Sequence, residues 1–341
     1  MRAAVLTEPR RLELHDLERP SPADDEVLVR VQEVGICGSD IHYFEHGRIG
    51  HYVVDEPLVL GHESAGHVVE VGDAVTHLSP EDRVTLEPGI PCRRCEYCRR
   101  GRYHLCPHVD FMATPPDDGA FVEYIAWPAD FVYPLPESVS IREGALCEPL
   151  SVALHANELA ALRPGDSVLI TGAGPIGLVI LEVVLAAGVT DVIVTDVIDS
   201  KLDRARKRGA HEVVNVEDEP VAPTIAAATG DRGVDVVIEA SGAASTYAQA
   251  IAAVEPGGTI VCVGLATEAT IPLDMVDITL NEITVQGAIR YSNTYDAAIS
   301  LLADGRVDVA GLVDAVMPLE EIGAAFERAM EPETVKVMVD I

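Results

Sequence analysis

Four cysteines of the chain are spaced like the ligands of a tetrahedral metal site. Two, two and seven residues separate the successive members, Cys92, Cys95, Cys98 and Cys106. Four thiolates complete the coordination of a zinc ion and leave no position open for a substrate. Iron–sulfur clusters use the same ligand type, but the arginines between these cysteines (93, 94, 99 and 100) disfavour a cluster. The spacing therefore predicts a structural zinc that holds a surface loop.

Two other segments bring together a thiol, an imidazole and a carboxylate. The first reads Cys37-Gly38-Ser39-Asp40-Ile41-His42, and the second reads Gly61-His62-Glu63-Ser64-Ala65-Gly66. One sulfur, one nitrogen and one oxygen ligand leave the fourth position of a zinc ion open, as a catalytic zinc requires. Cys37, His62 and Glu63 are therefore predicted to hold the metal at which the chemistry occurs.

A glycine-rich turn has the sequence of a dinucleotide-binding site. It reads Gly172-Ala173-Gly174-Pro175-Ile176-Gly177, follows an apolar strand and opens a helix. Gly172 makes the tight turn, Gly174 lets the backbone approach a pyrophosphate, and Gly177 lets helix and sheet pack closely. The helix N-terminus adds N–H groups and partial positive charge, which attract phosphate. Gly172, Gly174, Pro175, Ile176 and Gly177 are the predicted cofactor-binding residues of this turn.

The acidic residue after the next strand indicates which cofactor binds. Asp196 can accept hydrogen bonds from ribose hydroxyls, and its charge repels a 2′-phosphate. The three residues that follow it include no arginine, so the sequence favours NAD. Lys201 is also predicted to bind the cofactor. Because Lys201 and Arg204 lie close enough to hold a 2′-phosphate, NADP stays an alternative cofactor.

The elements that must position these residues differ between the two halves of the chain. Short β-branched runs cut by Gly and Pro fill the part before about residue 150, among them 26–31, 67–71 and 120–124, and predict antiparallel strands. Apolar strands at 167–171, 192–195, 234–238 and 259–263 then alternate with helices, one reaching to about 187 and another starting at Ser200. That alternation predicts a parallel, doubly wound sheet. From about residue 291 the sequence is helical again, and it ends in a strand-like run at 336–339.

The fold class is therefore α/β, and the chain is long enough for two cores. We expect a catalytic domain over 1–152 that carries both zinc sites. A nucleotide-binding domain follows over 153–290, and residues 291–341 return to the catalytic domain.

The charge is unusual. The chain has 56 acidic and 24 basic residues, a formal net charge of −32, and only three lysines, Lys201, Lys207 and Lys336. Such a surface repels nucleic acid and anionic membranes, so neither is an expected partner. The scarcity of lysine throughout the chain favours adaptation to a salt-rich cytosol over a merely solubilising surface, and so predicts a halophilic protein.

Nothing in the N-terminal residues resembles the apolar region of a signal peptide. The apolar stretch 168–189 contains Pro175, Glu182 and four glycines, and a strand–turn–helix explains it better than a membrane span. Seven cysteines do not form an even disulfide set, and four of them have metal spacing. A soluble protein of the reducing cytoplasm is expected.

The whole chain resembles the zinc-containing medium-chain alcohol dehydrogenases and, within them, the sorbitol and xylitol (polyol) branch. The matching segments span both predicted domains and lie at 35–43, 46–50, 60–63, 113–119, 148–152 and 290–294. The resemblance implies a GroES-like β-rich catalytic domain, a Rossmann domain, two zinc ions per chain and NAD. It also implies oxidation of a secondary hydroxyl of a polyol to a ketone, and a homo-oligomer, most simply a tetramer.

The resemblance also assigns roles to individual residues. Ser39 and His42 match the positions of a proton relay, although His42 could be an ordinary surface histidine. Glu148 lies beside the metal in this family; since Cys37 and Glu63 already neutralise the zinc, we expect Glu148 mainly to hydrogen-bond metal-bound water or to bind transiently. The residues implied to line the substrate pocket are Tyr43, Phe111, Thr114, Arg290 and Tyr291. Tyr43 and Phe111 could instead belong to the core, and Arg290 could pair with an acidic neighbour.

Two other functions compete with a polyol dehydrogenase. A zinc dehydrogenase of the same architecture could act on threonine, 2,3-butanediol or an aldose, but the segments at 37–39 and 290–294 resemble the polyol branch. A non-catalytic relative would be expected to lack a zinc ligand or a glycine of the turn, and all of them are present.

Overall fold

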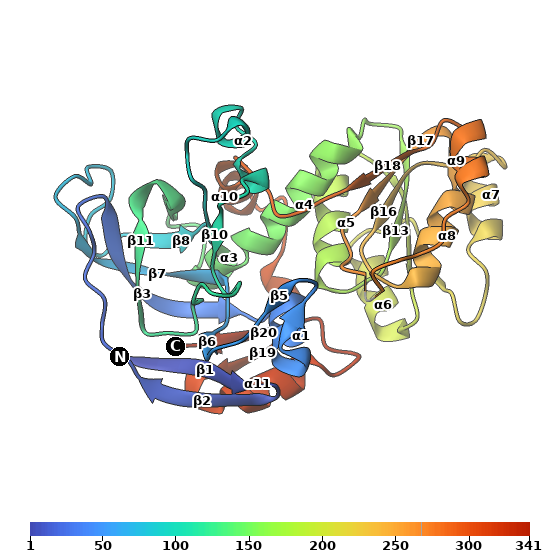
Figure 1. Cartoon of the computed structure of the whole chain (residues 1–341). Helices are drawn as coiled ribbons and strands as arrows, with labels where there is room; N and C mark the ends of the chain where they lie inside the picture. Colours follow the sequence, from blue (N-terminus) through green and yellow to red (C-terminus); the bar gives the residue numbers. More distant parts are fainter. Residues whose placement is uncertain (267) are drawn as a thin grey trace. The chain divides into compact units, whose positions relative to one another are not determined.

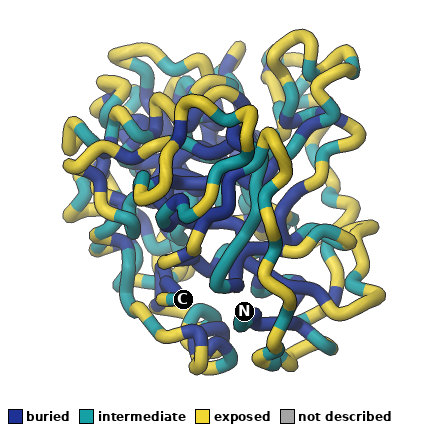
Figure 2. Tube along the Cα trace, turned by 90° about the vertical axis from the view of Figure 1, so that its left-hand side faces the viewer, coloured by how far each residue is buried: buried dark blue, intermediate teal, exposed yellow. Residues whose placement is uncertain are grey.

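The computed structural model describes residues 1–266 and 268–341 and divides into two compact units. The first unit contains Met1–Glu148 and Ser292–Ile341, and the second contains Pro149–Tyr291. The chain therefore passes from one unit to the other twice, after Glu148 and after Tyr291. Buried and exposed stretches alternate along the chain (Figure 2).

The first unit is organised around one long strand. This strand, β3 (Glu26–Gly35), pairs antiparallel with β7 (Glu63–Val71), β11 (Tyr124–Pro128) and β20 (Lys336–Asp340). Arg30 and Gln32 are exposed between buried neighbours, as the period-two alternation of β3 requires. The full sheet has seven strands, and its last member in the chain, β20, also pairs in parallel with β19 (Val313–Pro318). The end of the chain thus completes the sheet that the beginning of the chain starts.

Smaller elements complete this unit. Its remaining strands are β1 (Arg2–Glu8), β2 (Arg11–Asp16), β4 (Arg48–Ile49), β5 (Tyr52–Val53), β6 (Leu58–Val59), β8 (Arg83–Leu86), β9 (Gly89–Ile90), β10 (Asp110–Phe111) and β12 (Val132–Pro134). Its helices are α1 (Gly38–His46), α2 (Glu96–Arg99), α3 (Ile141–Ala145), α10 (Tyr295–Ala303) and α11 (Ile322–Ala329). Phe326 of α11 packs against Phe44 and Phe121 with ring centroids 5.0 Å and 5.9 Å away. Aromatic packing therefore joins the C-terminal helix to the N-terminal core.

The second unit is a six-stranded parallel sheet with helices on its faces. The strand order is β15-β14-β13-β16-β17-β18, so β14 and β15 follow on one side of β13 and the later strands follow on its other side. Open parallel sheets bind their ligands at such a switch point, here between β13 and β16. Helix α5 lies on one face and α8 on the other (Figure 1). The strands are β13 (Ser167–Thr171), β14 (Asp191–Asp196), β15 (Glu212–Asn215), β16 (Val234–Glu239), β17 (Val254–Cys262) and β18 (Thr284–Gly287). The helices are α5 (Pro175–Ala186), α6 (Asp199–Lys207), α7 (Ala222–Thr229), α8 (Ala244–Ala253) and α9 (Met275–Leu280), while α4 (Cys147–Ala160) begins in the first unit.

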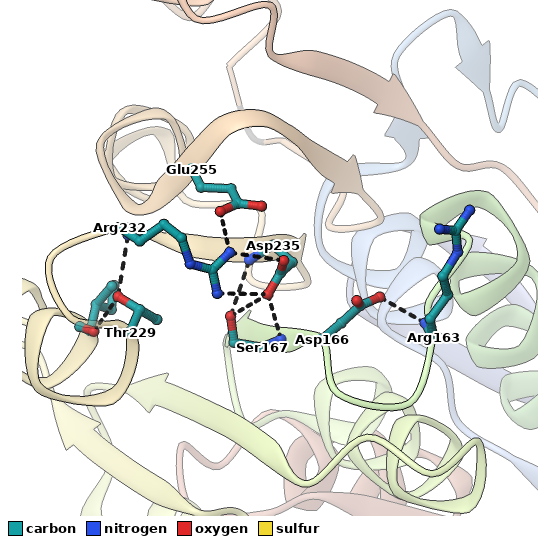
Figure 3. Close-up of polar contacts among 9 residues, drawn as sticks. Arg163, Asp166, Ser167, Thr229, Arg232, Asp235 and Glu255 are labelled. Atoms are coloured by element: carbon teal, nitrogen blue, oxygen red, sulfur yellow. Dashed lines mark hydrogen bonds and ion pairs between the residues drawn. The ribbon is translucent and has the colours of Figure 1, made fainter.

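Polar contacts fix the amino-terminal ends of the two central strands (Figure 3). Ser167 at the start of β13 donates from its N–H and hydroxyl to Asp235 of β16, over 2.8 Å and 2.6 Å. Arg232 pairs with the same carboxylate at 3.1 Å and also with Glu255. Burial alone would raise the pKa of Asp235, but the hydrogen bonds from Arg232 and Ser167 lower it well below its ordinary value. These contacts set the register of β13 against β16 and leave the opposite ends of the strands for the glycine turn.

The structure corrects one expected strand and adds strands that were not expected, among them β15, β18 and β19. The run 120–124 was expected to be a strand, but β11 starts at Tyr124 and only Val122 forms an isolated bridge, with Ala3. The preceding residues turn instead: Ala120 donates to Gly61 O and Phe121 donates to Leu60 O. In the described part of the chain, no helix is both long enough and apolar enough to cross a membrane.

Candidate metal centres and cofactor turn

The four cysteines of the predicted structural site come together in space. All four Sγ atoms lie within 4.8 Å of one another, with 3.9 Å between Cys92 and Cys98 and 3.3 Å between Cys95 and Cys98. In a tetrahedral site with zinc–sulfur bonds of about 2.3 Å, neighbouring sulfurs lie about 3.8 Å apart. Backbone N–H groups of Arg94 and Cys95 lower the pKa of Cys92 to about 6, whereas burial and the neighbouring thiols raise the pKa of Cys98 to about 12. The loop therefore fits a closed zinc site, which we call the four-cysteine loop (residues 92–106).

The three residues of the predicted catalytic set also come together. The ligand atoms of Cys37, His62 and Glu63 lie within 4.8 Å of one another. Cys37 is the N-cap residue of α1, so its sulfur lies at the N-terminal end of that helix. His62 and Glu63 follow Gly61, whose φ of 91° lets the chain turn into β7. The donor set of one sulfur, one nitrogen and one oxygen fits a zinc ion with an open position.

A buried carboxylate joins the two ligand segments. Asp40 is fully buried and accepts from Cys37 N–H through Oδ2 and from Gly61 N–H through Oδ1, both over 2.9 Å. Its Oδ1 also lies 3.5 Å from Nδ1 of His62, close enough to orient the imidazole electrostatically. Asp40 is not among the site residues that the sequence predicts. Its place three residues after Cys37, in the first turn of a helix, is the signal that could have identified it.

A buried lysine balances the charge of Glu63. Nζ of Lys336 lies 2.7 Å and 2.8 Å from the two carboxylate oxygens of Glu63 and 3.0 Å from the backbone oxygen of Ile36, so its three donors are all used. Burial disfavours the charge on Lys336, yet Glu63 and Cys37 raise its pKa above the ordinary value. The carboxylate occupies the space beside Gly35, where a Cβ would lie 1.9 Å from Oε2 of Glu63.

Sequence reasoning missed Lys336, although it is one of only three lysines and interrupts a run of valines. It also changes the charge balance on which the expectation for Glu148 depended. Lys336 would add one positive charge to the two of a bound zinc, and so would offset part of the negative charge of Cys37, Glu63, Glu148 and the neighbouring Asp40. The expectation for Glu148, which counted only Cys37 and Glu63 against the zinc, therefore left out one cation and one anion.

The structure places the remaining predicted catalytic residues near this set without adding them to it. Glu148 is buried in the first turn of α4, lies close enough to influence the charge of Lys336, and does not belong to the group of three ligand atoms. Ser39 and His42 are half-buried on α1. Burial and then the charge of His46 lower the pKa of His42, which keeps its imidazole neutral and able to accept a proton at pH 7.

Three of the five predicted pocket residues belong to the first unit. Phe111 lies beside a predicted metal ligand, with its ring centroid 5.8 Å from that of His62. Tyr43 is buried, and burial raises its pKa to about 12 against the opposing effect of a hydrogen bond with Thr114. The other two, Arg290 and Tyr291, are the last residues of the second unit.

The glycine turn has the geometry that its sequence predicts. Gly172 has a φ of 96°, and a Cβ at Gly177 would lie 1.9 Å from the backbone oxygen of Gly172, so a larger residue would separate helix and turn. Space is open beside Gly174, where the N-terminus of α5 begins. Lys201 lies on α6, half-buried.

Asp196 has a structural part in this turn that the sequence did not reveal. Its Oδ2 accepts from Ala173 N–H over 2.6 Å, and its Oδ1 accepts from Val197 and Ile198 over 2.8 Å and 2.9 Å. A carboxylate has about four acceptor positions. One therefore remains for a ribose hydroxyl while the others hold the turn.

Both halves of the chain match known families. Residues 23–137 match the alcohol dehydrogenase GroES-like domain, and residues 175–304 match the zinc-binding dehydrogenase family. The chain is 45% identical to sorbitol dehydrogenase of Bacillus subtilis over 341 residues, covering 99% of this chain and 97% of that one. It is 41% identical to a putative D-xylulose reductase of Agrobacterium fabrum over 347 residues, covering 100% and 99%.

Solved structures agree with these matches. An oxidoreductase of unknown specificity from Escherichia coli superposes with a TM-score of 0.96 at 39% identity and covers 100% of this chain and 99% of its own. Two others, each covering 100% and 99%, contain a nicotinamide cofactor: a zinc-binding dehydrogenase from Sinorhizobium meliloti bound to NADP (31%, TM-score 0.91) and an alcohol dehydrogenase from Escherichia coli in complex with NADH (27%, TM-score 0.93).

The two metal sites should respond differently to the loss of one ligand. We expect metal analysis of the purified protein to give two zinc ions per chain. Cys95→Ser should lose one zinc and lower the free energy of unfolding by about 2 kcal/mol or more, which corresponds to a drop in Tm of roughly 4–8 °C, yet retain hydride transfer. Cys37→Ser should lose turnover and keep its Tm within a few degrees. A single zinc, or iron, in the unmodified protein would contradict the assignment of the two sites.

Proposed function

Because this chain belongs to the zinc-dependent medium-chain alcohol dehydrogenases, we propose that it oxidises a secondary hydroxyl of a sorbitol- or xylitol-type polyol to a ketose and transfers the hydride to NAD. Zinc and a nicotinamide dinucleotide are the cofactors of the family to which it belongs. The observation that carries the proposal is the mixed set Cys37, His62 and Glu63, whose ligand atoms lie within 4.8 Å of one another.

The residues of the first unit each have a task in this reaction. Zinc held by Cys37, His62 and Glu63 would lower the pKa of the bound substrate hydroxyl, and NAD would accept the hydride. Asp40 keeps Cys37 and His62 in place through the two ligand segments. Lys336 donates to both oxygens of Glu63, so a bound zinc would share this carboxylate with Lys336.

The proton of the substrate hydroxyl must leave the site. Ser39 lies two residues after Cys37 and His42 one turn further along α1, and a neutral His42 can accept a proton from a serine hydroxyl or from water. Glu148 lies near Lys336, and we expect it to hydrogen-bond a water or hydroxyl group at the open position. Phe111 and Tyr43 add apolar surface near the ligands, which excludes bulk water.

The choice of a polyol over the other secondary alcohols rests on the relatives. Proteins named sorbitol dehydrogenase and D-xylulose reductase are 41–45% identical to this chain over nearly all of their length. A 2R,3R-butanediol dehydrogenase from Bacillus subtilis is 31% identical. Arg290 and Tyr291 would hold the hydroxyl groups of the polyol that do not react.

The same proposal includes a homo-oligomer, most simply a tetramer, working in a salt-rich cytoplasm. Six exposed apolar residues lie on β18, the edge strand of the second unit's sheet, on α9 before it, or in the segments that follow β17 and β18. We call them the edge patch: Leu265, Met275, Val276, Leu280, Val285 and Ile289. Their exposed fractions run from 41% to 78%. An edge strand with apolar neighbours offers its unused backbone groups to a second copy of itself. Seven free cysteines, with four at one metal site, agree with a reducing compartment.

Cofactor preference should depend on the charge of Asp196. The variant Asp196→Asn keeps the size and one acceptor oxygen of the side chain, so it disturbs the turn less than Asp196→Ser would. We expect the ratio of kcat/KM for NAD to kcat/KM for NADP to fall by about tenfold or more in either variant, because the repulsion of the 2′-phosphate is lost. Unfolding curves measured beside the kinetics separate this effect from loosening of the turn. A wild-type preference for NADP would refute the NAD assignment.

Assembly should depend on the edge patch and on salt. Leu280→Asp should shift sedimentation toward a smaller species, whereas Leu14→Asp, a change at an exposed leucine of the first unit, should leave the oligomer intact. Since the net charge is −32, lowering the salt concentration should also weaken assembly through self-repulsion. A monomer in multimolar salt would argue against the oligomer.

The substrate should be a polyol rather than a simple alcohol. A monoalcohol would not form the hydrogen bonds that the other hydroxyls of a polyol would make with Arg290 and Tyr291, and each such bond lost costs about 1–3 kcal/mol. Xylitol or sorbitol should therefore exceed 2-propanol in kcat/KM by about a hundredfold, and Arg290→Ala should remove most of that difference. Arg206→Ala, at an exposed arginine of α6, is the matched control and should change nothing. Equal activity on xylitol and 2-propanol in the wild type would refute the polyol assignment.

A further inference from the structure

The chain has an unusual backbone where it leaves the second unit. Arg290 and Asn293 have φ angles of 50° and 59°. Residues other than glycine rarely adopt this left-handed conformation, and it persists only where the surroundings hold it. Asn293 tolerates it, but a long side chain such as that of Arg290 adopts it at some cost. The four residues from Arg290 to Asn293, which we call the return turn, therefore need an anchor.

The anchor is the four-cysteine loop. Tyr103 Oη accepts from Asn293 N–H over 2.8 Å, Gly101 O accepts from Asn293 Nδ2 over 2.9 Å, and His104 Nδ1 lies 2.9 Å from Ser292 Oγ. All three partners lie between Cys98 and Cys106, inside the loop that the sulfur cluster closes. His104 and Ser292 are both buried, which shields their hydrogen bond from water.

A buried carboxylate fixes the direction of the central hydrogen bond. Glu87 is 2% exposed and accepts from Tyr103 over 2.7 Å and from Tyr133 over 2.9 Å, each at a different oxygen. A tyrosine hydroxyl has one proton. Tyr103 donates this proton to Glu87, so the hydroxyl oxygen of Tyr103 can only accept a further hydrogen bond. It accepts from the N–H of Asn293. Glu87 thereby prepares Tyr103 to receive the return turn.

The return turn begins with the two residues to which the proposed function gives the polyol hydroxyls. Three residues of chain span at most about 11 Å. Arg290 therefore stays within that distance of Asn293, whatever else it contacts.

We propose that the four-cysteine loop is a positioning element for substrate recognition: residues 101–104 hold Ser292 and Asn293, and through them fix the backbone of Arg290 and Tyr291. Tyr103 and Asn293 are positioning residues in this scheme. The zinc of this loop then contributes to substrate choice as well as to stability. We call the hydrogen bonds between residues 101–104 and the return turn the clamp. The role of Arg290 rests on the proposed function, but the clamp does not.

A tyrosine variant and its matched control test the clamp. Tyr103→Phe and Tyr133→Phe each remove one hydrogen bond to Glu87, but only Tyr103→Phe removes the acceptor of Asn293 N–H. Hydrogen exchange of the zinc-loaded protein should show the amides of 290–294 exchanging about tenfold faster in Tyr103→Phe, as expected for the loss of one hydrogen bond, and unchanged in Tyr133→Phe. Equal exchange in the two variants would overturn the clamp.

Kinetics then test its effect on recognition. Tyr103→Phe should lower kcat/KM for xylitol about tenfold, mainly by raising KM, and leave 2-propanol nearly unchanged. Tyr133→Phe should keep both values, and both variants should retain two zinc ions. Cys95→Ser should also lower the ratio of kcat/KM for xylitol to kcat/KM for 2-propanol. Parallel losses on both alcohols would overturn the positioning role, since they indicate general damage.

A second variant covers the case in which Tyr103→Phe does not fold. Asn293→Gly tolerates the left-handed backbone and removes only the side-chain bond to Gly101, so it should reproduce the faster exchange and the selective loss on xylitol. Unchanged exchange and kinetics in this variant would count against the clamp. If the wild type does not oxidise polyols but Tyr103→Phe alone speeds exchange, the proposed function fails and the clamp stands.

Discussion

The buried ion pair between Glu63 and Lys336 is the constraint on which the first unit depends. Two opposite charges are buried together with every donor of the lysine used, a situation in which loss of either partner leaves the other charge uncompensated. The pair can form only when three strands lie side by side: β7 brings Glu63, β3 brings Gly35, and β20 brings Lys336. Gly35 provides the space, because any side chain there would displace the carboxylate. A predicted metal ligand near the start of the chain is thus completed by the last strand of the chain.

Carboxylates perform the same double task in both units. Asp40 accepts from two backbone N–H groups and so joins the segments that carry Cys37 and His62. Asp196 accepts from three and so joins the glycine turn to the end of β14. In each case the oxygen atoms that orient a functional group also hold the loop that carries it. A substitution of Asp40 or Asp196 therefore changes the charge at the site and the conformation of the loop together. A variant of the same size, such as Asn, disturbs the loop less than a shorter side chain does.

Sequence alone predicted what is local. The four-cysteine spacing and the glycine turn lie within short segments, and both their elements and their geometry agree with the structure; the strand from 167 and the helix after it were also found where expected. Contacts between distant segments could not be predicted in this way. Lys336 and Glu63 are 273 residues apart, and Asn293 and Tyr103 are 190 apart. The run 120–124 resembled a strand because its residues alternate, but its N–H groups bond to the irregular segment at 60–61, which no single-chain pattern reveals.

The scarcity of lysine has a practical consequence for anyone who wishes to label or immobilise this protein. One of its three lysines, Lys336, has its amine buried against Glu63, so reagents for primary amines reach it only if the first unit opens. The other two, Lys201 and Lys207, both lie on α6, and the N-terminal amine is partly covered where it donates to Leu17 O. Amine coupling would therefore attach a dye or a solid support to one helix, the helix that directly follows Asp196. Thiol coupling, by contrast, would compete with zinc at five of the seven cysteines, which are predicted metal ligands.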